Sequence, residues 1–145
     1  MKRILVVDKD KEFRSCIFEA FKGSDYDVVT AENSIWALNF LKTLPIDLVI
    51  CDLRVSPAGG YELLSQIKEE YPHVIRIIMS QNTEEASVLK AIVQNIARFY
   101  ILKPLKNENV LEYVGHIFDT EEFLKSNDLF HLVNNIEKIS NIKSS

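Results

Sequence analysis

Five short apolar runs alternate with amphipathic segments along this chain, and their regular spacing restricts the folds that it can adopt. The runs cover residues 3–7, 26–31, 47–51, 75–79 and 98–102, so they begin at intervals of 23, 21, 28 and 23 residues. They are rich in Val, Ile and Leu, and β-branched residues are typical of strands. Residues 48–51 and 75–79 are apolar almost throughout, as expected of strands whose two faces are both buried.

The segments between these runs have the periodicity of helices. Apolar residues recur at three- and four-residue spacings in segments 10–22, 34–43, 61–71 and 84–94, which places them on one face of each helix. A fifth helix is expected over residues 107–118, with Asn107 as its N-cap and an apolar stripe of Val110, Leu111, Val114 and Ile117. This alternation predicts an α/β fold, a (βα)5 unit whose doubly wound, parallel five-stranded sheet is covered on both faces.

Length and composition exclude several other classes of protein. The chain has 145 residues, of which 47% are hydrophobic and 26% are charged, so one globular domain is expected. The net charge of −4 leaves no basic stripe for direct binding of nucleic acid. Asp8 comes too early for a signal peptide, and no apolar run approaches the ~20 residues of a membrane helix. Cys16 and Cys51 lack a CxxC partner, so we expect reduced thiols in a cytoplasmic protein without a membrane anchor.

The last part of the chain has a different pattern, because no sixth strand follows the fifth helix. Residues 120–124 can prolong that helix, and a second amphipathic stripe consists of Leu129, Leu132, Val133, Ile136 and Ile139. This stripe is too short to predict a coiled coil, so it either docks on its own domain or forms a short linker or dimerisation helix. We therefore divide the chain into a domain of residues 1–118 and a helical C-terminal tail or linker of residues 119–145.

Polar residues follow four of the five expected strands. They are Asp8, Asp52, Ser80 and Lys103, after the first, third, fourth and fifth strands. Ligands of an open parallel sheet bind outside the carboxyl ends of its strands, so these four side chains are expected to meet at one edge. An aspartate beside a lysine, a hydroxyl and a second carboxylate is a candidate nucleophile for phosphoryl groups.

Four segments of the sequence resemble motifs of the receiver domain of two-component response regulators. ILVVDKD is similar to the acidic motif of the first strand, and DLVICDLRVSPAGGYELL to the phosphoacceptor segment with its downstream Gly60. IIMSQ resembles the switch motif of strand four, and FYILKP the Lys-Pro motif of strand five. The resemblance covers about residues 2–118, and it implies a flavodoxin-like receiver fold with a C-terminal helical extension.

The resemblance also implies roles for individual residues. Asp52 would be the phosphoacceptor, and Lys103 would pair first with Asp52 and then with a phosphoryl oxygen. Ser80 and Tyr100 match the switch positions, where Ser80 would donate a hydrogen bond to the phosphoryl group as Tyr100 turns inward. The implied donor is a sensor histidine kinase, a phosphotransfer protein or a small acyl phosphate. The implied recipient of the signal is a downstream protein target or an output domain.

One position departs from the family in a way that affects the cofactor. The family carries a second acid after Asp8, normally a direct ligand of Mg²⁺, and this chain has Lys9 there. The remaining ligands would be Asp52, the backbone carbonyl of Arg54 and, through water, Asp8. Lys9 either swings outward and leaves a weakened metal site, or it places its ammonium beside Asp52 in place of the metal.

Three functions from different classes follow from these residues. The expected one is an aspartyl-phosphate signalling switch in a phosphorelay, which is not an enzyme. Its output would pass through protein contacts, and the tail could form a homodimer. The alternative is a pseudo-receiver, a protein-interaction module that does not depend on phosphorylation because Lys9 replaces an acid. The third is a phosphatase of the haloacid-dehalogenase type, which needs an Asp two positions after the nucleophile. This chain has Arg54 there, which argues against that function.

Overall fold

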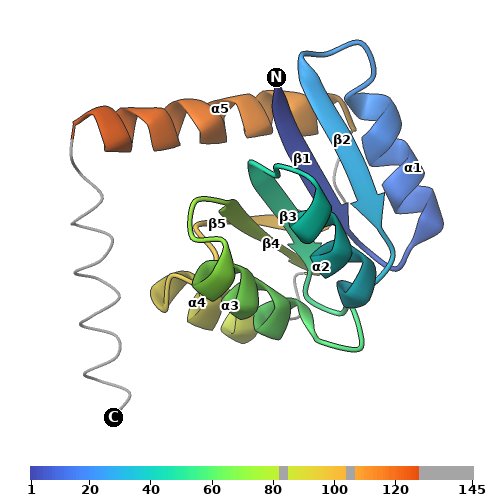
Figure 1. Cartoon of the computed structure of the whole chain (residues 1–145), viewed down its shortest axis with the longest axis vertical. Coiled ribbons are helices and arrows are strands. Elements are labelled where there is room, and N and C mark those ends of the chain that lie inside the picture. The colour runs from blue at the N-terminus through green and yellow to red at the C-terminus, as the bar shows by residue number, and fades with distance from the viewer. Residues whose placement is uncertain (82–84, 104–106, 128–145) are drawn as a thin grey trace.

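The structure is a computed structural model that describes residues 1–81, 85–103 and 107–127. Its five parallel strands lie in the order β2-β1-β3-β4-β5 (Figure 1). The strands are β1 (Lys2–Val7), β2 (Tyr26–Ala31), β3 (Leu48–Asp52), β4 (Ile75–Gln81) and β5 (Phe99–Lys103). The helices are α1 (Lys11–Ala20), α2 (Ser34–Thr43), α3 (Gly60–Glu70), α4 (Glu85–Val93) and α5 (Asn107–Ser126). The expected doubly wound (βα)5 architecture is confirmed.

The ends of the elements differ from the expected ones by a few residues. Asp10 is not part of α1 but caps it, because its carboxylate accepts hydrogen bonds from the amides of Glu12 and Phe13. The capping contacts expected of the Asn107 side chain lie outside the part of the chain that is described. Helix α5 continues beyond the expected end at residue 118, through residues 120–124, to Ser126. The predicted stripe of residues 129–139 also lies outside the described residues.

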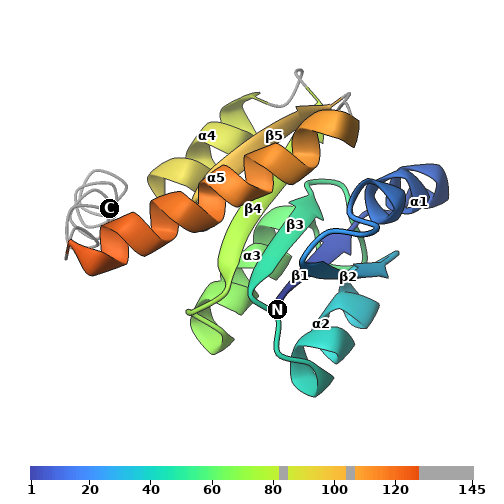
Figure 2. The same ribbon diagram turned by 90° about the horizontal axis from the view of Figure 1, so that it is seen from above.

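Helices cover both faces of the sheet (Figure 2), and each face buries its own apolar cluster. Alternate residues of a strand point to opposite faces, so Leu5 and Val7 pack towards α2, α3 and α4, whereas Ile4 and Val6 pack towards α1 and α5. Because helices cover both faces, the polar groups that follow the strands can meet only at the edge formed by the carboxyl ends. Within the described part of the chain, no helix is long and apolar enough to span a membrane.

The C-terminal half of α5 packs at the amino ends of the strands. The ring of Phe118 stacks on Tyr26 with 5.7 Å between centroids, and Arg98 forms an ion pair of 3.1 Å with Glu121. Burial raises the pKa of Glu121 above its usual value, although the charges of Arg98 and Arg76 act in the opposite direction. The helix therefore contacts the domain on both sides of residue 118, and the division of the chain at that residue stays a prediction.

The start of α3 touches the end of β3 so closely that only glycine fits. A Cβ atom on Gly60 would lie 2.4 Å from the carbonyl oxygen of Asp52 and 2.7 Å from the Cα atom of Leu53. The Gly60 amide donates a hydrogen bond of 3.0 Å to the Leu53 carbonyl, which fixes this approach. The position of Asp52 thus depends on the missing side chain of Gly60.

Replacing Gly60 by alanine should lower the free energy of unfolding by about 1–3 kcal/mol, because the new methyl group overlaps the backbone of β3. The matched control is Gly115→Ala in α5, where the nearest atom to an added Cβ is the Tyr26 hydroxyl at 3.7 Å. Alanine is favoured over glycine inside a helix by about 0.5–1 kcal/mol, so this variant should be more stable than the wild type. Urea denaturation measures both effects, and an equal response to the two substitutions would contradict the close approach.

Glu121→Gln should change stability in a pH-dependent way. Because the folded-state pKa of Glu121 is raised, the folded chain binds its proton more readily than the unfolded chain does. The stability of the wild type should therefore rise relative to Glu121→Gln as the pH falls from about 7 to about 4, through the carboxyl titration range. The exposed neighbour Glu122 provides the control variant, Glu122→Gln. A difference between wild type and Glu121→Gln that is constant with pH would refute the burial effect.

Candidate functional site

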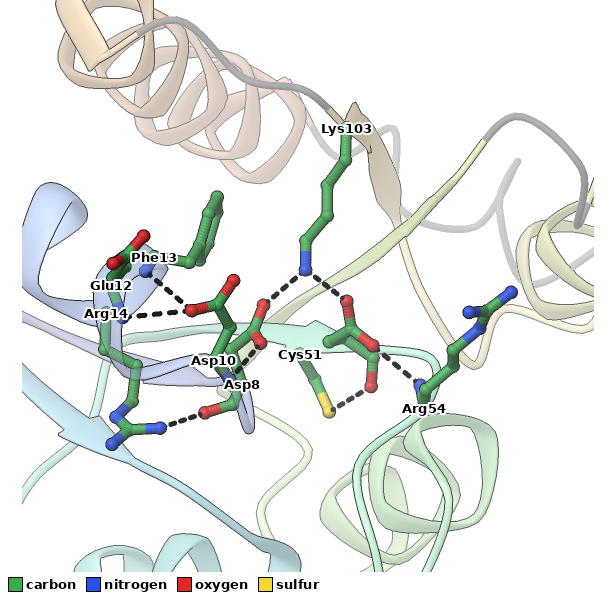
Figure 3. A network of polar contacts seen from close by, with 9 residues as sticks. Asp8, Asp10, Glu12, Phe13, Arg14, Cys51, Arg54 and Lys103 are labelled. Atoms are coloured by element: carbon green, nitrogen blue, oxygen red, sulfur yellow. Dashed lines mark hydrogen bonds and ion pairs between the residues drawn. The ribbon is translucent and has the colours of Figure 1, made fainter.

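Two carboxylates and one ammonium meet at the carboxyl ends of the strands (Figure 3). Asp8 follows β1, Asp52 ends β3 and Lys103 ends β5. The Nζ atom of Lys103 lies 2.6 Å from Oδ2 of Asp8 and 2.7 Å from Oδ2 of Asp52. Asp8 is 1% exposed and Asp52 is 7% exposed. A single ammonium therefore balances part of the charge of two buried carboxylates.

The backbone orients the second oxygen of each carboxylate. Oδ1 of Asp8 accepts a hydrogen bond of 2.9 Å from the Asp10 amide, and Oδ1 of Asp52 accepts one of 2.8 Å from the Arg54 amide. In both cases the donor is two residues further along the chain, an arrangement that short aspartate side chains adopt readily at the start of a turn. The Arg14 guanidinium donates a hydrogen bond of 2.7 Å to the backbone carbonyl of Asp8. Both carboxylates are thus held in fixed directions before any ligand binds.

The ammonium of Lys103 is stabilised in its charged form. Burial by itself would lower its pKa, but the hydrogen bonds to Asp52 and Asp8 and the charges of these carboxylates outweigh this effect, and the pKa is raised above its usual value. Lys103 therefore carries its charge at neutral pH, where it can neutralise a developing anion.

The buried thiol beside the site is unsuited to act as the nucleophile. Cys51 is fully buried, and its Sγ atom donates a weak hydrogen bond of 3.4 Å to the carbonyl of Asp52. Burial and the nearby charges of Asp52 and Asp8 raise the pKa of this thiol well above its usual value. A thiol that stays protonated is a poor nucleophile, so Asp52 is the better candidate.

Among the described residues, neither of the two predicted switch residues forms a hydrogen bond with the carboxylates of Asp8 and Asp52. Ser80 lies in β4 with 1% exposure, and its hydroxyl donates a hydrogen bond of 3.2 Å to the backbone carbonyl of Gln81. Tyr100 lies in the edge strand β5 with 49% of its surface exposed, and its carbonyl accepts a hydrogen bond from the Tyr113 hydroxyl. The structure thus has a buried hydroxyl near the site and an outward-facing tyrosine.

Lys9 has the outward orientation, one of the two expected from the sequence, and does not place its ammonium beside Asp52. Its side chain is exposed, and it forms no hydrogen bond or ion pair with any described residue. The cation beside Asp52 is Lys103 and not Lys9. The rim of the site therefore carries an additional positive charge that is free to turn towards a ligand.

The donor set for a metal ion is small. In residues 1–81, 85–103 and 107–127, no group of three or more His, Cys, Asp or Glu side chains is placed to hold a metal. Asp8, Asp52 and the carbonyl of Arg54 offer hard oxygen ligands. Mg²⁺ is often bound through one or two carboxylates together with phosphate oxygens. These oxygen atoms could contribute to a Mg²⁺ site only together with further ligands such as phosphoryl oxygens or water.

Two residues of α1 belong to the site although they were not predicted as site residues from the sequence. The ring centroid of Phe13 lies 4.6 Å from Nζ of Lys103, and Arg14 holds the backbone of Asp8 as described above. Both residues lie in the first turns of a helix that directly follows Asp8. That position is the only sequence feature that could have pointed to them.

Comparison with known protein families identifies the whole domain. The family model for the response regulator receiver domain matches residues 4–115. The chemotaxis protein CheY of Listeria monocytogenes is 32% identical over 113 residues, which cover 77% of this chain and 94% of that protein. The transcriptional regulatory protein ZraR of Klebsiella oxytoca is 32% identical over 102 residues, and the hydrogenase transcriptional regulatory protein HoxA of Cupriavidus necator is 24% identical over 118 residues. The aligned parts cover 23% of ZraR and 24% of HoxA, so this chain spans about a quarter of these two regulators.

Solved structures show the same fold. A CheY-like receiver domain from Methanospirillum hungatei has a TM-score of 0.76 and 24% identity, and the match covers 84% of this chain and 97% of that one. A receiver domain from Clostridium thermocellum has a TM-score of 0.68 and 23% identity, with 98% of each chain covered. Together with the family model and the relative of similar length, these matches show that the chain belongs to the response regulator receiver domain family, the signalling modules of two-component systems.

Proposed function

We propose that this chain is a phosphorylation-controlled switch in which Asp52 accepts a phosphoryl group. The proposal rests above all on the arrangement of Asp52 at the ligand-binding edge of the sheet. Its carboxylate is oriented by the Arg54 amide and forms an ion pair with Lys103. An oxygen of Asp52 attacks phosphorus, and the bond from phosphorus to the donor's imidazole nitrogen or carboxylate oxygen breaks. The bonding electron pair leaves with the donor. A single transfer is followed by slow hydrolysis, so the role is that of a switch and not of an enzyme.

Charge is the main obstacle to this reaction, and Lys103 is placed to overcome it. A phosphoryl donor brings negative charge towards Asp8 and Asp52, which are themselves anionic and buried. The Lys103 ammonium would exchange its contact with Asp52 for one with a phosphoryl oxygen, a charge-assisted hydrogen bond that stabilises the transition state. A bound Mg²⁺, held by Asp52, the Arg54 carbonyl and Asp8 through water, would supply further neutralisation of the phosphoryl oxygens.

The proposed signal leaves the site through β4 and β5. The Ser80 hydroxyl would turn from the Gln81 carbonyl towards the phosphoryl group, and Tyr100 would turn inward from its exposed position. The exposed apolar side chains of α4 and β5 then change their arrangement; they are Leu89, Val93, Tyr100 and Leu102. Exposed apolar side chains favour binding to another protein, which supports a downstream protein target or an output domain as the recipient. The donor would be a sensor histidine kinase or a phosphotransfer protein.

Lys9 supports a second candidate function, a pseudo-receiver that binds its partner without phosphorylation. An exposed ammonium occupies the position at which the resemblance implies a metal-binding acid, and Lys103 already balances part of the charge of Asp8 and Asp52. A site that is closed by internal ion pairs can hold one conformation without a ligand.

Incubation with acetyl phosphate should add one phosphoryl group to the wild type, detected by intact mass. Asp52→Asn should give no adduct, because the nucleophile is lost. Asp119→Asn, a change to an exposed aspartate of α5, should leave the adduct intact and serves as the matched control. Lys9→Asp should lower the Mg²⁺ concentration needed for half-maximal labelling, because a carboxylate replaces an ammonium at the rim. An unlabelled wild type under conditions that label Lys9→Asp would overturn the switch and favour the pseudo-receiver.

We also propose that the tail makes the protein a homodimer. Removing residues 128–145 keeps every contact described for α5, including the ion pair of Arg98 with Glu121. Light scattering should give the mass of a dimer for the full chain and of a monomer for the shortened one, because the apolar stripe of the tail is removed. A full-length variant with Leu132→Asp and Ile136→Asp should behave as the shortened chain does. Monomer masses for all three proteins would rule out this role of the tail.

A further inference from the structure

Lys103 has a third neighbour besides its two carboxylate partners. The ring of Phe13 lies beside the end of the Lys103 side chain, with Nζ 4.6 Å from the ring centroid (Figure 3). A cation over the face of an aromatic ring is attracted by the negative charge of that face. With the ring and the two carboxylates around it, the Lys103 side chain keeps only 19% of its surface exposed.

We propose that Phe13 is a positioning residue for phosphoryl transfer. Its ring limits the positions of the Lys103 ammonium while that ammonium exchanges its contact with Asp52 for a contact with the phosphoryl group. The proposal rests on the proposed function of Asp52 as the acceptor. Phe13 itself forms and breaks no bond, and the proton of Lys103 stays on its nitrogen throughout.

The need for such a residue follows from what happens to the partners of Lys103. When Asp52 becomes an acyl phosphate, the oxygen that Lys103 contacts is changed, and the new negative charge lies further out on the phosphoryl group. Of the three neighbours of the ammonium, Asp8 and Phe13 keep their chemistry in both states. A lysine side chain has a flexible four-carbon stem, so an attraction that is the same before and after transfer restricts the positions that it samples.

Phe13 is well suited to this role because its backbone is tied to the same loop as Asp8. The Phe13 amide donates a hydrogen bond of 3.3 Å to Asp10, and the Asp10 amide donates one of 2.9 Å to Asp8. Arg14, the next residue of the helix, donates to the Asp8 carbonyl at 2.7 Å. The ring and the carboxylate on which the ammonium rests are therefore held on one short, hydrogen-bonded segment. The Phe13 side chain also packs against the apolar cluster beneath α1 and α5.

The test compares Phe13→Leu with Phe13→Tyr. Leucine keeps an apolar side chain but removes the aromatic face, whereas tyrosine keeps the face. Phe18→Leu is the matched control, because Phe18 lies on the same helix and is 50% exposed. Under saturating acetyl phosphate, Phe13→Leu should slow formation of the Asp52 adduct by about 2- to 30-fold, because without the cation–π contact a smaller fraction of molecules holds the Lys103 ammonium in the productive position. The half-saturating donor concentration should not change. Phe13→Tyr and Phe18→Leu should react at the rate of the wild type.

A second measurement reports on the contact without any phosphorylation. The Lys103 Hε protons lie near an aromatic face, so their NMR signals should be shifted upfield in the wild type and in Phe13→Tyr, and this shift should vanish in Phe13→Leu. An unchanged adduct rate in Phe13→Leu, with a labelled wild type, overturns the positioning role alone. An unlabelled wild type that still shows the upfield signals overturns the acceptor role of Asp52, and the positioning role with it. Absence of the shift in the wild type overturns the contact itself.

Discussion

The sharing of one ammonium between two buried carboxylates is the interaction on which the rest of this site depends. Asp8 and Asp52 are brought together by neighbouring strands, and without a cation their mutual repulsion in a buried place would be costly. Lys103 comes from β5, which is separated from β3 by β4. Strands lie about 4.8 Å apart, so the lysine must reach across roughly 10 Å of sheet edge. Only a long, flexible cation at the end of β5 can do so.

This arrangement also explains why the neighbours of the site matter. Gly60 lets α3 begin directly against the carbonyl of Asp52, and the Arg54 amide orients the carboxylate of the same residue. On the other side, α1 supplies the ring of Phe13 and the guanidinium of Arg14. The three charged groups are thus held from both sides by elements whose own stability comes from the two apolar clusters. A substitution that alters the packing of α1 or α3 should therefore also shift the positions of the carboxylates.

The sequence was sufficient to predict the strands, the helices and the meeting of Asp8, Asp52 and Lys103, because parallel strands with buried faces share one polar edge. Ser80 was expected to join them, but its hydroxyl donates to the Gln81 carbonyl. The distances between these groups depend on strand order and side-chain conformation, which periodicity does not contain. Phe13 was missed for a related reason: on a helical stripe, an aromatic residue that packs in the core has the same pattern as one that faces a lysine. The continuation of α5 to Ser126 was suggested only in part, since its contact between Arg98 and Glu121 joins residues far apart in the sequence.

The ion pair of Arg98 with Glu121 has a mechanical consequence. Arg98 directly precedes β5 and Lys103 ends it, so a five-residue strand about 16 Å long is fastened at both ends by charged contacts. At one end the fastening is the pair of carboxylates, and at the other it is the helix that follows the strand in the chain. β5 therefore links the site at the carboxyl ends of the strands to the ion pair of Arg98 with Glu121 at their amino ends. A shift of β5 along its axis would thus change both the contacts of Lys103 and the ion pair of Arg98 with Glu121.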